Sequence, residues 1–378
     1  MAGIYVHIPF CRSRCIYCDF YSTIRESEIA GYVTALCREA KERSEELGAN
    51  TCVDTVYFGG GTPSLLTETQ LGCILEYISS VCNVSRQAEV TVEMNPDDVA
   101  RLSLPRGFGR VSLGIQTFDN GLLRILHRRH DAATAIEAVK RLQAAGCRNI
   151  GIDLIYGLPG QTMEQWRRDL DTAFALDIQH LSAYALSYEP DTPLHRMLLE
   201  GSVAETDEEM STGMYYMLCE RAAREGFEHY EISNFALPGF ASRHNSSYWN
   251  GTPYLGLGPG AHSYDGQRTR RANIPDLSAY LRFWNGHAND AEGEKLYRKE
   301  VLSDSELFDE AVMCGLRTAQ GIDLGIVAKR FGQRRVDYLM QMARPHLSAK
   351  RMALTGHCLS LVEEALMVAD DVVSDLML

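Results

Sequence analysis

Three closely spaced cysteines near the start of the sequence carry its clearest chemistry. Cys11, Cys15 and Cys18 lie in the run Cys-Arg-Ser-Arg-Cys-Ile-Tyr-Cys. Iron–sulfur clusters are usually held by four cysteine thiolates, so three thiolates on one short loop can bind a cluster and leave one iron open. An open coordination position lets a small molecule bind or react at a metal. The spacing therefore indicates a reactive iron–sulfur cluster.

A zinc ion is the alternative occupant for the same thiolates. Structural zinc normally has four protein ligands, and His7 or Asp19 could provide the fourth. Zinc modules usually carry a second pair of ligands, however, and no such pair follows closely in the sequence. The pattern thus favours the cluster.

The composition bounds the class of protein. The 378 residues are 45% hydrophobic with a formal net charge of -13. This length supports a large α/β domain and a smaller one. The negative charge argues against a broad electrostatic surface for nucleic acid, so no nucleic-acid partner is expected. There is no apolar run of about 18 residues and no signal-peptide pattern at the amino terminus. These features predict a cytoplasmic protein.

The remaining cysteines are scattered through segments that resemble helices and strands. The total of 11 is odd and the chain is large, which argues against a disulfide framework. A free cysteine often packs as a small buried hydrophobe. Structural roles are therefore expected for Cys37, Cys52, Cys73, Cys82, Cys147, Cys219, Cys314 and Cys358.

Short β-type runs alternate with helix-period runs over the first half of the sequence. Such alternation predicts βα units around a parallel sheet. Helices are expected near residues 29–40 and 136–142, where apolar residues recur at helical spacing. The expected strands are residues 4–8, 55–58, 89–94, 110–116, 149–156 and 181–188.

Side chains in these strands alternate between an aliphatic and a polar face. In the third strand, Val90, Val92 and Met94 lie on one face, whereas Thr91 and Glu93 lie on the other. If the aliphatic faces meet the helices, the inner faces are too small and polar to fill a closed eight-stranded barrel. We therefore expect an α/β fold, a partial (β/α)6-type barrel with a cavity.

Polar residues at the carboxyl ends of the strands mark the expected site. Barrel enzymes place their active sites at this end. Solvated strand ends are the alternative, but the pattern recurs on several strands. The residues concerned are 59–62, Glu93, Gln116 and Asp153.

Capping boxes predict three helix starts. A Ser or Thr followed three positions later by Glu or Gln satisfies two backbone donors reciprocally. The pairs are Thr162 with Gln165, Thr206 with Glu209, and Ser303 with Glu306.

The second half of the sequence predicts a smaller, mostly helical C-terminal domain with a small hairpin. A polar linker is expected over residues 285–294, and an apolar alternating stretch over 359–378. The expected domains are the barrel over 1–235, a segment closing the barrel over 236–290, and the C-terminal domain over 291–378.

The spacing Cys-x3-Cys-x2-Cys, after a strand and before a long helix, resembles the radical S-adenosylmethionine superfamily. In that superfamily the open iron binds the amino and carboxylate groups of S-adenosylmethionine, and an electron from the cluster cleaves the sulfonium. The resemblance implies a [4Fe-4S] cluster as cofactor, on Cys11, Cys15 and Cys18. It also implies S-adenosylmethionine as a second cofactor, with binding residues at Tyr5, Tyr17, Gly60, Gly61, Thr62, Glu93, Gln116, Arg128 and Asp153.

Longer runs resemble the porphyrin-linked branch of this superfamily, the oxygen-independent coproporphyrinogen III oxidases. These runs are residues 5–11, 58–64, 112–118 and 153–160, and the resemblance covers nearly the whole chain. The oxidases carry a further cysteine two positions after the third, where this sequence has Phe20. Phe20 instead matches the HemW family of heme chaperones, which implies a protein without coproporphyrinogen oxidase activity. The stretch over 95–110 is shorter than in the family, so its helix is expected to be truncated.

A second motif of the HemW family is His-Asn-x-x-Tyr-Trp, present here from His244 to Trp249. The resemblance implies that His244 binds heme, since neutral imidazole is a good axial ligand. An aromatic loop anchor with a surface histidine is the alternative reading, and His262 is a second candidate ligand. Arg268, Arg270 and Arg271 could pair with heme propionates or form an exposed charge run.

The resemblance therefore implies a heme chaperone that transfers heme to acceptor proteins, some of them membrane-associated. It implies an electron donor such as flavodoxin or ferredoxin, and a monomer or a cluster-dependent dimer. Oxygen-independent coproporphyrinogen III dehydrogenase, which decarboxylates propionates, is the alternative function. Radical modification of tRNA is disfavoured by the acidic charge balance.

Overall fold

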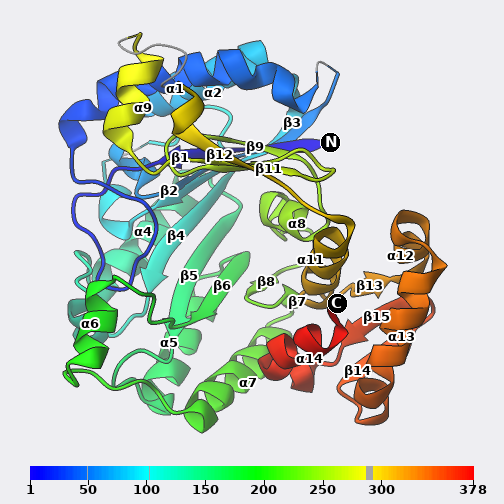
Figure 1. The fold of residues 1–378 in the computed structure, drawn as a ribbon. Coiled ribbons are helices and arrows are strands. Elements are labelled where there is room, and N and C mark those ends of the chain that lie inside the picture. Colours follow the sequence, from blue (N-terminus) through cyan, green and yellow to red (C-terminus); the bar gives the residue numbers. More distant parts are fainter. Residues whose placement is uncertain (49, 102, 287–292) are drawn as a thin grey trace.

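The computed structural model describes residues 1–48, 50–101, 103–286 and 293–378, and one large sheet dominates it (Figure 1). The sheet has 12 strands in the order β12-β11-β10-β9-β1-β2-β3-β4-β5-β6-β8-β7. Strands β1 to β6 are parallel neighbours in sequence order. They are β1 (Ala2–Ile8), β2 (Val53–Gly60), β3 (Val84–Met94), β4 (Arg110–Gln116), β5 (Ile150–Tyr156) and β6 (His180–Ala185).

These parallel strands confirm the predicted α/β partial barrel. Each expected strand is present, with its ends shifted by a few residues. Further strands extend the sheet on both sides, so the barrel stays open; the one next to β1 is parallel to it, and the others pair antiparallel. They are β7 (Glu228–Glu231), β8 (Asn234–Ala236), β9 (Tyr254–Leu257), β10 (His262–Tyr264), β11 (Thr269–Asn273) and β12 (Tyr297–Val301).

Helices pack on the outer, aliphatic face of the sheet (Figure 1). Val90, Val92 and Met94 of β3 are buried in the main hydrophobic core, as the alternation predicted. The helices of this part are α1 (Ile29–Arg43), α2 (Glu68–Val81), α3 (Asn120–Ile125), α4 (Ala132–Ala144), α5 (Met163–Phe174), α6 (Pro193–Leu199), α7 (Glu208–Arg224), α8 (Arg243–Trp249) and α9 (Leu277–Trp284).

The connection after β3 is short, as expected. Among the described residues between β3 and β4 there is a 3-10 turn, η4 (Pro96–Asp98), and no α-helix. The barrel therefore has one helical crossover fewer at this position.

Two of the three predicted capping boxes are confirmed. Thr162 with Gln165 caps α5, and Ser303 with Glu306 caps α11 (Asp304–Leu316). The prediction for α7 was wrong by one residue, because the Asp207 carboxylate accepts from Met210 N at 2.9 Å and caps the helix. Thr206 has another role: its hydroxyl donates to the Gly157 carbonyl at 3.0 Å.

The C-terminal part has a hydrophobic core of its own, with residues such as Phe308, Leu339 and Leu376. It contains the expected hairpin, formed by β14 and β15. No helix among the described residues is long and apolar enough to cross a membrane. The elements are α11, β13 (Ile322–Asp323), α12 (Leu324–Phe331), α13 (Gln333–Ser348), β14 (Met352–Thr355), β15 (Cys358–Leu361), η6 (Glu363–Val368) and α14 (Ala369–Leu376).

The predicted alternating stretch over 359–378 was wrong beyond β15, because the chain ends in helix α14. Ala369, Val372, Val373 and Leu376 are its buried residues, at the i, i+3, i+4 and i+7 spacing of a helix. The predicted domain boundaries stay predictions. The boundary at 290/291 and most of the predicted linker lie outside the described residues.

Candidate functional site

A cavity of about 560 Å³ opens at the carboxyl ends of the parallel strands. The cysteine loop that follows β1 forms part of its wall. The fold therefore brings the loop and the polar strand ends to one place. The predicted site residues that line the cavity are Cys11, Cys15, Tyr17, Cys18, Gly60, Gly61, Thr62, Glu93, Gln116, Arg128 and Asp153.

Backbone hydrogen bonds fix the cysteine loop at its start, middle and end. Cys11 N donates to the Thr23 carbonyl at 2.9 Å, and Cys18 N donates to the Cys15 carbonyl at 3.3 Å. Leu194 N, in α6, donates to the Ile16 carbonyl at 2.9 Å. The loop is therefore attached to the rest of the barrel, although all three thiols stay partly accessible.

The thiols of this loop lie in a partly desolvated environment. Burial raises the pKa of Cys11 and raises that of Cys18 to about 11, so both are neutral thiols at pH 7 unless a cation binds. Among the described residues, the sulfurs of Cys11, Cys15 and Cys18 are not all within 4.8 Å of one another. A single zinc ion with bonds of about 2.3 Å needs sulfurs at most about 4.6 Å apart. The three sulfurs would therefore have to move closer together to bind one zinc ion.

Arg128 brings positive charge to the loop. Its Nη1 donates to Cys15 Sγ at 3.2 Å, and its Nη2 donates to Asn95 Oδ1 at 2.8 Å and to the Gly114 carbonyl at 2.5 Å. A metal-bound thiolate is negatively charged, so a guanidinium beside it would balance that charge. Arg128 was predicted from the sequence, whereas Asn95 was missed.

Asn95 follows directly after β3 and joins two predicted residues. Its amide nitrogen donates to Thr62 Oγ1 at 3.2 Å, and its oxygen accepts from Arg128. Thr62 in turn donates to Cys11 Sγ at 3.4 Å. The position of Asn95 at a strand end was the sequence signal that could have identified it.

The glycine turn after β2 packs too closely against β1 and the residues that follow it to hold side chains, and it lines the cavity. A Cβ on Gly61 would lie 2.8 Å from the Phe10 carbonyl oxygen, and Gly60 has a φ of +106°. Only glycine fits both requirements without strain. The backbone is thus exposed to a ligand beside the cysteine loop.

Two partly buried carboxyl groups also line the cavity. Glu93 accepts from the Tyr57 hydroxyl at 2.8 Å and from Gly60 N at 3.1 Å. Burial, together with the Asp153 carboxylate, raises the pKa of Glu93 to about 7. Burial also raises the pKa of Asp153, which accepts from the Ser112 hydroxyl at 3.2 Å.

Gln116 ends β4 with strained backbone. Its φ is +73°, in the left-handed region that is unfavourable for residues with a Cβ. The register with β5 also shifts between Gly114 and Gln116. Strain of this kind is concentrated at functional sites and re-aims the side chain, and here Gln116 lines the cavity.

Tyr5 and His244 are not among the residues that line this cavity. The Tyr5 hydroxyl lies 3.0 Å from His7 Nδ1, and its ring stacks on Tyr57 at 6.2 Å. The structure therefore gives no support for a contact between Tyr5 and a ligand in the cavity. Of the two residues considered as a fourth zinc ligand, His7 is buried and Asp19 lines the cavity.

His244 is only 1% exposed, which differs from both the ligand and the surface-histidine readings. Its Nδ1 lies 2.8 Å from Thr55 Oγ1, and its Nε2 lies 2.9 Å from the Tyr248 hydroxyl. Burial lowers the pKa of His244 to about 3, so the ring is neutral. In this conformation neither nitrogen is available to iron.

The other heme candidates also lie away from the cavity. His262 begins β10 at the surface. Carboxylates pair with all three arginines of the predicted propionate site: Arg268 with Asp304, Arg270 with Glu310 and Arg271 with Glu46, each at 2.9 Å. The alternative reading as a charged surface fits these arginines better.

Comparisons with known proteins agree with this geometry. The family model described as the radical SAM superfamily matches residues 5–173. The heme chaperone HemW of Lactococcus lactis is 36% identical over 84% of this chain and 82% of its own length. HemW of Bacillus subtilis is 34% identical over 88% of both chains.

A mitochondrial protein and a solved structure complete the comparison. Radical S-adenosyl methionine domain-containing protein 1 of Danio rerio is 32% identical over 85% of this chain and 74% of its own. Coproporphyrinogen III oxidase (HemN) of Escherichia coli superposes with a TM-score of 0.82 at 21% identity, covering 100% of this chain and 90% of that one. That likeness shows the fold alone, whereas the sequence relatives show the family. The chain therefore belongs to the radical SAM superfamily and, within it, to the HemW family.

Proposed function

We propose that this protein binds heme and transfers it to acceptor proteins, and that it carries a [4Fe-4S] cluster and S-adenosylmethionine. The observation that carries the proposal is the similarity to proteins named heme chaperone HemW over 84% and 88% of the chain. The identity of residue 20 also supports the proposal. Phe20 is 62% exposed and lines the cavity where the resembled oxidases have a cysteine, and its side chain cannot bind metal.

The cysteine loop is the proposed cluster site. Cys11, Cys15 and Cys18 would provide three thiolates, and Thr62 and Arg128 already donate to two of the sulfurs. Such donors tune a cluster and stabilise its negative charge. Membership of the radical SAM superfamily implies the same cofactors.

The rest of the cavity is the proposed site for S-adenosylmethionine. Its volume of about 560 Å³ lies within the usual range for small-molecule sites, roughly 300–1,000 Å³. The turn at Gly60 and Gly61 would let the methionine end approach the backbone. Glu93 would accept from the ribose hydroxyls, which would lower its pKa toward the usual range.

The chemistry that the cluster and S-adenosylmethionine supply together, when bound, is one-electron cleavage of a sulfonium. The residues of this chain orient the ligand and exclude water from it. Arg128 and Asp153 both line the cavity. The proposal requires only that both cofactors are bound.

His244 is the proposed heme ligand, but its ring has to move before it can bind iron. Its ring must first leave Thr55 and Tyr248, which occupy both nitrogens. Because Tyr248 is partly exposed, movement of α8 at the surface would release the ring. The heme acceptor and the electron donor also stay proposals.

A heme titration tests the proposed function. Heme is added to the anaerobically purified full chain, and the Soret band is followed together with transfer of heme to an apoprotein acceptor. Saturable binding with one equivalent and transfer faster than free heme exchange are expected. Nonspecific, non-saturating absorbance with no acceleration of transfer would reject the proposal.

A further inference from the structure

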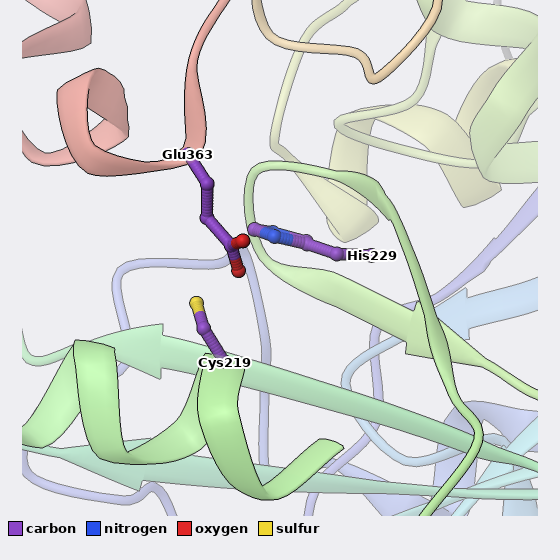
Figure 2. Close-up of side chains that lie close together, drawn as sticks. All are labelled: Cys219, His229 and Glu363. Atoms are coloured by element: carbon purple, nitrogen blue, oxygen red, sulfur yellow. The ribbon is translucent and has the colours of Figure 1, made fainter. Parts of the chain in front are cut away.

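A second cavity, of about 320 Å³, lies between the barrel and the C-terminal segment. It shares no lining residue with the cavity at the cysteine loop. Three side chains that can bind metal line it: Cys219 from α7, His229 from β7 and Glu363 from the start of η6. Figure 2 shows them directed toward one another from these three segments. The proposed heme function uses none of them.

The three side chains are already close enough to share one ion. One ligand atom from each of Cys219, His229 and Glu363 lies within 4.8 Å of the other two. A zinc ion binds sulfur at about 2.3 Å and nitrogen or oxygen at about 2.0–2.2 Å, so two of its ligands are at most about 4.6 Å apart. Small side-chain shifts would therefore complete the coordination.

The His229 ring is held in place from two directions. Its Nε2 lies 3.3 Å from the Ile232 carbonyl oxygen, and Phe235 stacks on the ring with centroids 4.1 Å apart. Histidines that bind metal usually have such a carbonyl partner, which fixes the tautomer and the orientation of the ring. The imidazole is thus oriented before any ligand binds.

One thiol and two carboxyl groups line the cavity, and the arginine that lines it is already paired with a carboxylate. Cys219 is 4% exposed, and burial together with the Glu363 carboxylate raises its pKa to about 12. Glu231 also lines the cavity, and burial raises its pKa to about 7. The nearby Arg317 is paired with Asp370 at 2.6 Å. A divalent ion would balance one thiolate and one carboxylate.

We propose that Cys219, His229 and Glu363 bind one divalent transition-metal ion of the zinc class. Thiolate and imidazole ligands select such ions over magnesium and calcium. Binding would convert the Cys219 thiol to a thiolate and release its proton to solvent. Three protein ligands leave a fourth position that faces the cavity and can hold water. The ion would join α7 and β7 to the segment after β15.

Metal binding to the full chain tests this proposal. Zn²⁺ is titrated into the metal-free protein in competition with a chromophoric chelator, and Co²⁺ is used as the spectroscopic probe. Because Cys11, Cys15 and Cys18 can also take up metal, the quantity compared is the difference between the parent and each variant. The variants are Cys219→Ser, His229→Gln and Glu363→Gln, and the matched controls are Cys82→Ser and Glu364→Gln.

The parent is expected to bind one more equivalent than the Cys219→Ser protein. Each ligand variant should weaken that equivalent by about 100-fold or more, since loss of an outer partner alone costs roughly 10- to 100-fold. The parent-minus-Cys219→Ser spectrum with Co²⁺ should show a thiolate charge-transfer band and tetrahedral d–d bands. Zn²⁺ should raise the melting temperature of the parent and of both controls, but not of the ligand variants.

Equal stoichiometry and affinity in the parent and all three ligand variants would overturn the proposal. The thiol and the carboxylate would then form a hydrogen bond without metal. Glu363 is exposed, so Glu363→Gln keeps the test valid if a variant of the buried Cys219 fails to fold. Neither result depends on heme binding, so the experiment tests the metal site independently of the proposed function.

Discussion

At the scale of single residues, Arg128 provides the positive charge beside the cysteine loop. The guanidinium is the cation that contacts Cys15, while Asn95 and the Gly114 carbonyl hold it in position. Arginine provides a planar fork of donors that lysine cannot reproduce. The sulfur environment is thus set by a residue that lies more than 100 positions away in the sequence.

Replacement of Cys15 by alanine should abolish the iron–sulfur cluster. One of three thiolate ligands is lost, and two thiolates do not hold a cubane. The measurement is iron content and visible absorbance after anaerobic reconstitution, with Cys147→Ala as control because Cys147 lies outside the cavity. A normal cluster in Cys15→Ala would show that the cluster site is elsewhere.

Glu93 should make the stability fall as the pH rises. Its pKa is about 7 in the folded protein and 4.5 in the unfolded chain, so the folded state holds a proton that the unfolded state releases between these values. Stability from this group is therefore fully present below about pH 4.5 and is lost as the pH rises to about 7. The difference is on the order of 3 kcal/mol at most.

Denaturant unfolding at several pH values checks this dependence in the protein without ligands. Asp169 and Glu231 also have raised pKa values, of about 6 and 7, and contribute with the same sign. The comparison is therefore between the parent and Glu93→Gln, whose pH slope should be smaller. Identical slopes would mean that Glu93 is ionised in the folded protein.

The two hydrogen bonds of His244 should restrain heme binding. Thr55→Val and Tyr248→Phe together free the imidazole, and each bond contributes a net of about 0.5–1.5 kcal/mol. If His244 binds heme iron after release, the double variant should bind heme on the order of tenfold more tightly. His244→Ala should lose this gain and shift the Soret band. Unchanged heme affinity in both variants would assign His244 a purely structural role.

At the scale of helices and strands, α7 shows how a single hydrogen bond decides where a helix begins. The sequence predicted a start at Thr206 with Glu209, whereas in the structure the helix is capped by Asp207. Thr206 bonds to the strand-end carbonyl of Gly157, which is a tertiary contact that no local pattern contains. Asp207 is then the residue that remains to cap the helix.

Asp207→Ala should destabilise the protein by about 1 kcal/mol, the usual value for loss of an N-cap. Glu209→Ala should have an effect within about 0.5 kcal/mol, because Glu209 makes no capping contact. Chemical denaturation of both variants provides the measurement. The reverse order of effects would restore the original capping box.

Strands and helices were predictable where the local pattern also decides the packing. The alternation in β3 identified both its core face and its polar face, since the side-chain period of a strand is fixed. The C-terminal helix α14 was missed because its short apolar run, Val372-Val373, fits either period. Packing against the second core makes it a helix.

At the scale of the whole molecule, the candidate site forms because the barrel is open. Parallel strands end at one edge, so residues from the loop after β1 to the end of β5 meet in one cavity. The sequence could predict these strand-end residues. It could not predict that Tyr5 does not line the cavity, because alternation gives the face of a strand residue but not its depth along the barrel.

The burial of His244 also could not be predicted from the sequence. The motif identified the residue, but its burial depends on α8 lying against β2, a contact between segments far apart in the sequence. The proposed metal-binding triad was missed for the same reason, since Cys219 and Glu363 come together only in the tertiary structure. Local patterns therefore predicted the cofactor loop and not the contacts between distant parts.

One anaerobic experiment tests the central claim, that this member of the superfamily binds heme instead of oxidising a porphyrinogen. The cluster-reconstituted chain is incubated with S-adenosylmethionine, reductant, coproporphyrinogen III and heme. Bound heme is measured by absorbance, and the porphyrin products by mass spectrometry. The account predicts saturable heme binding and unchanged coproporphyrinogen. Formation of protoporphyrinogen without bound heme would contradict it.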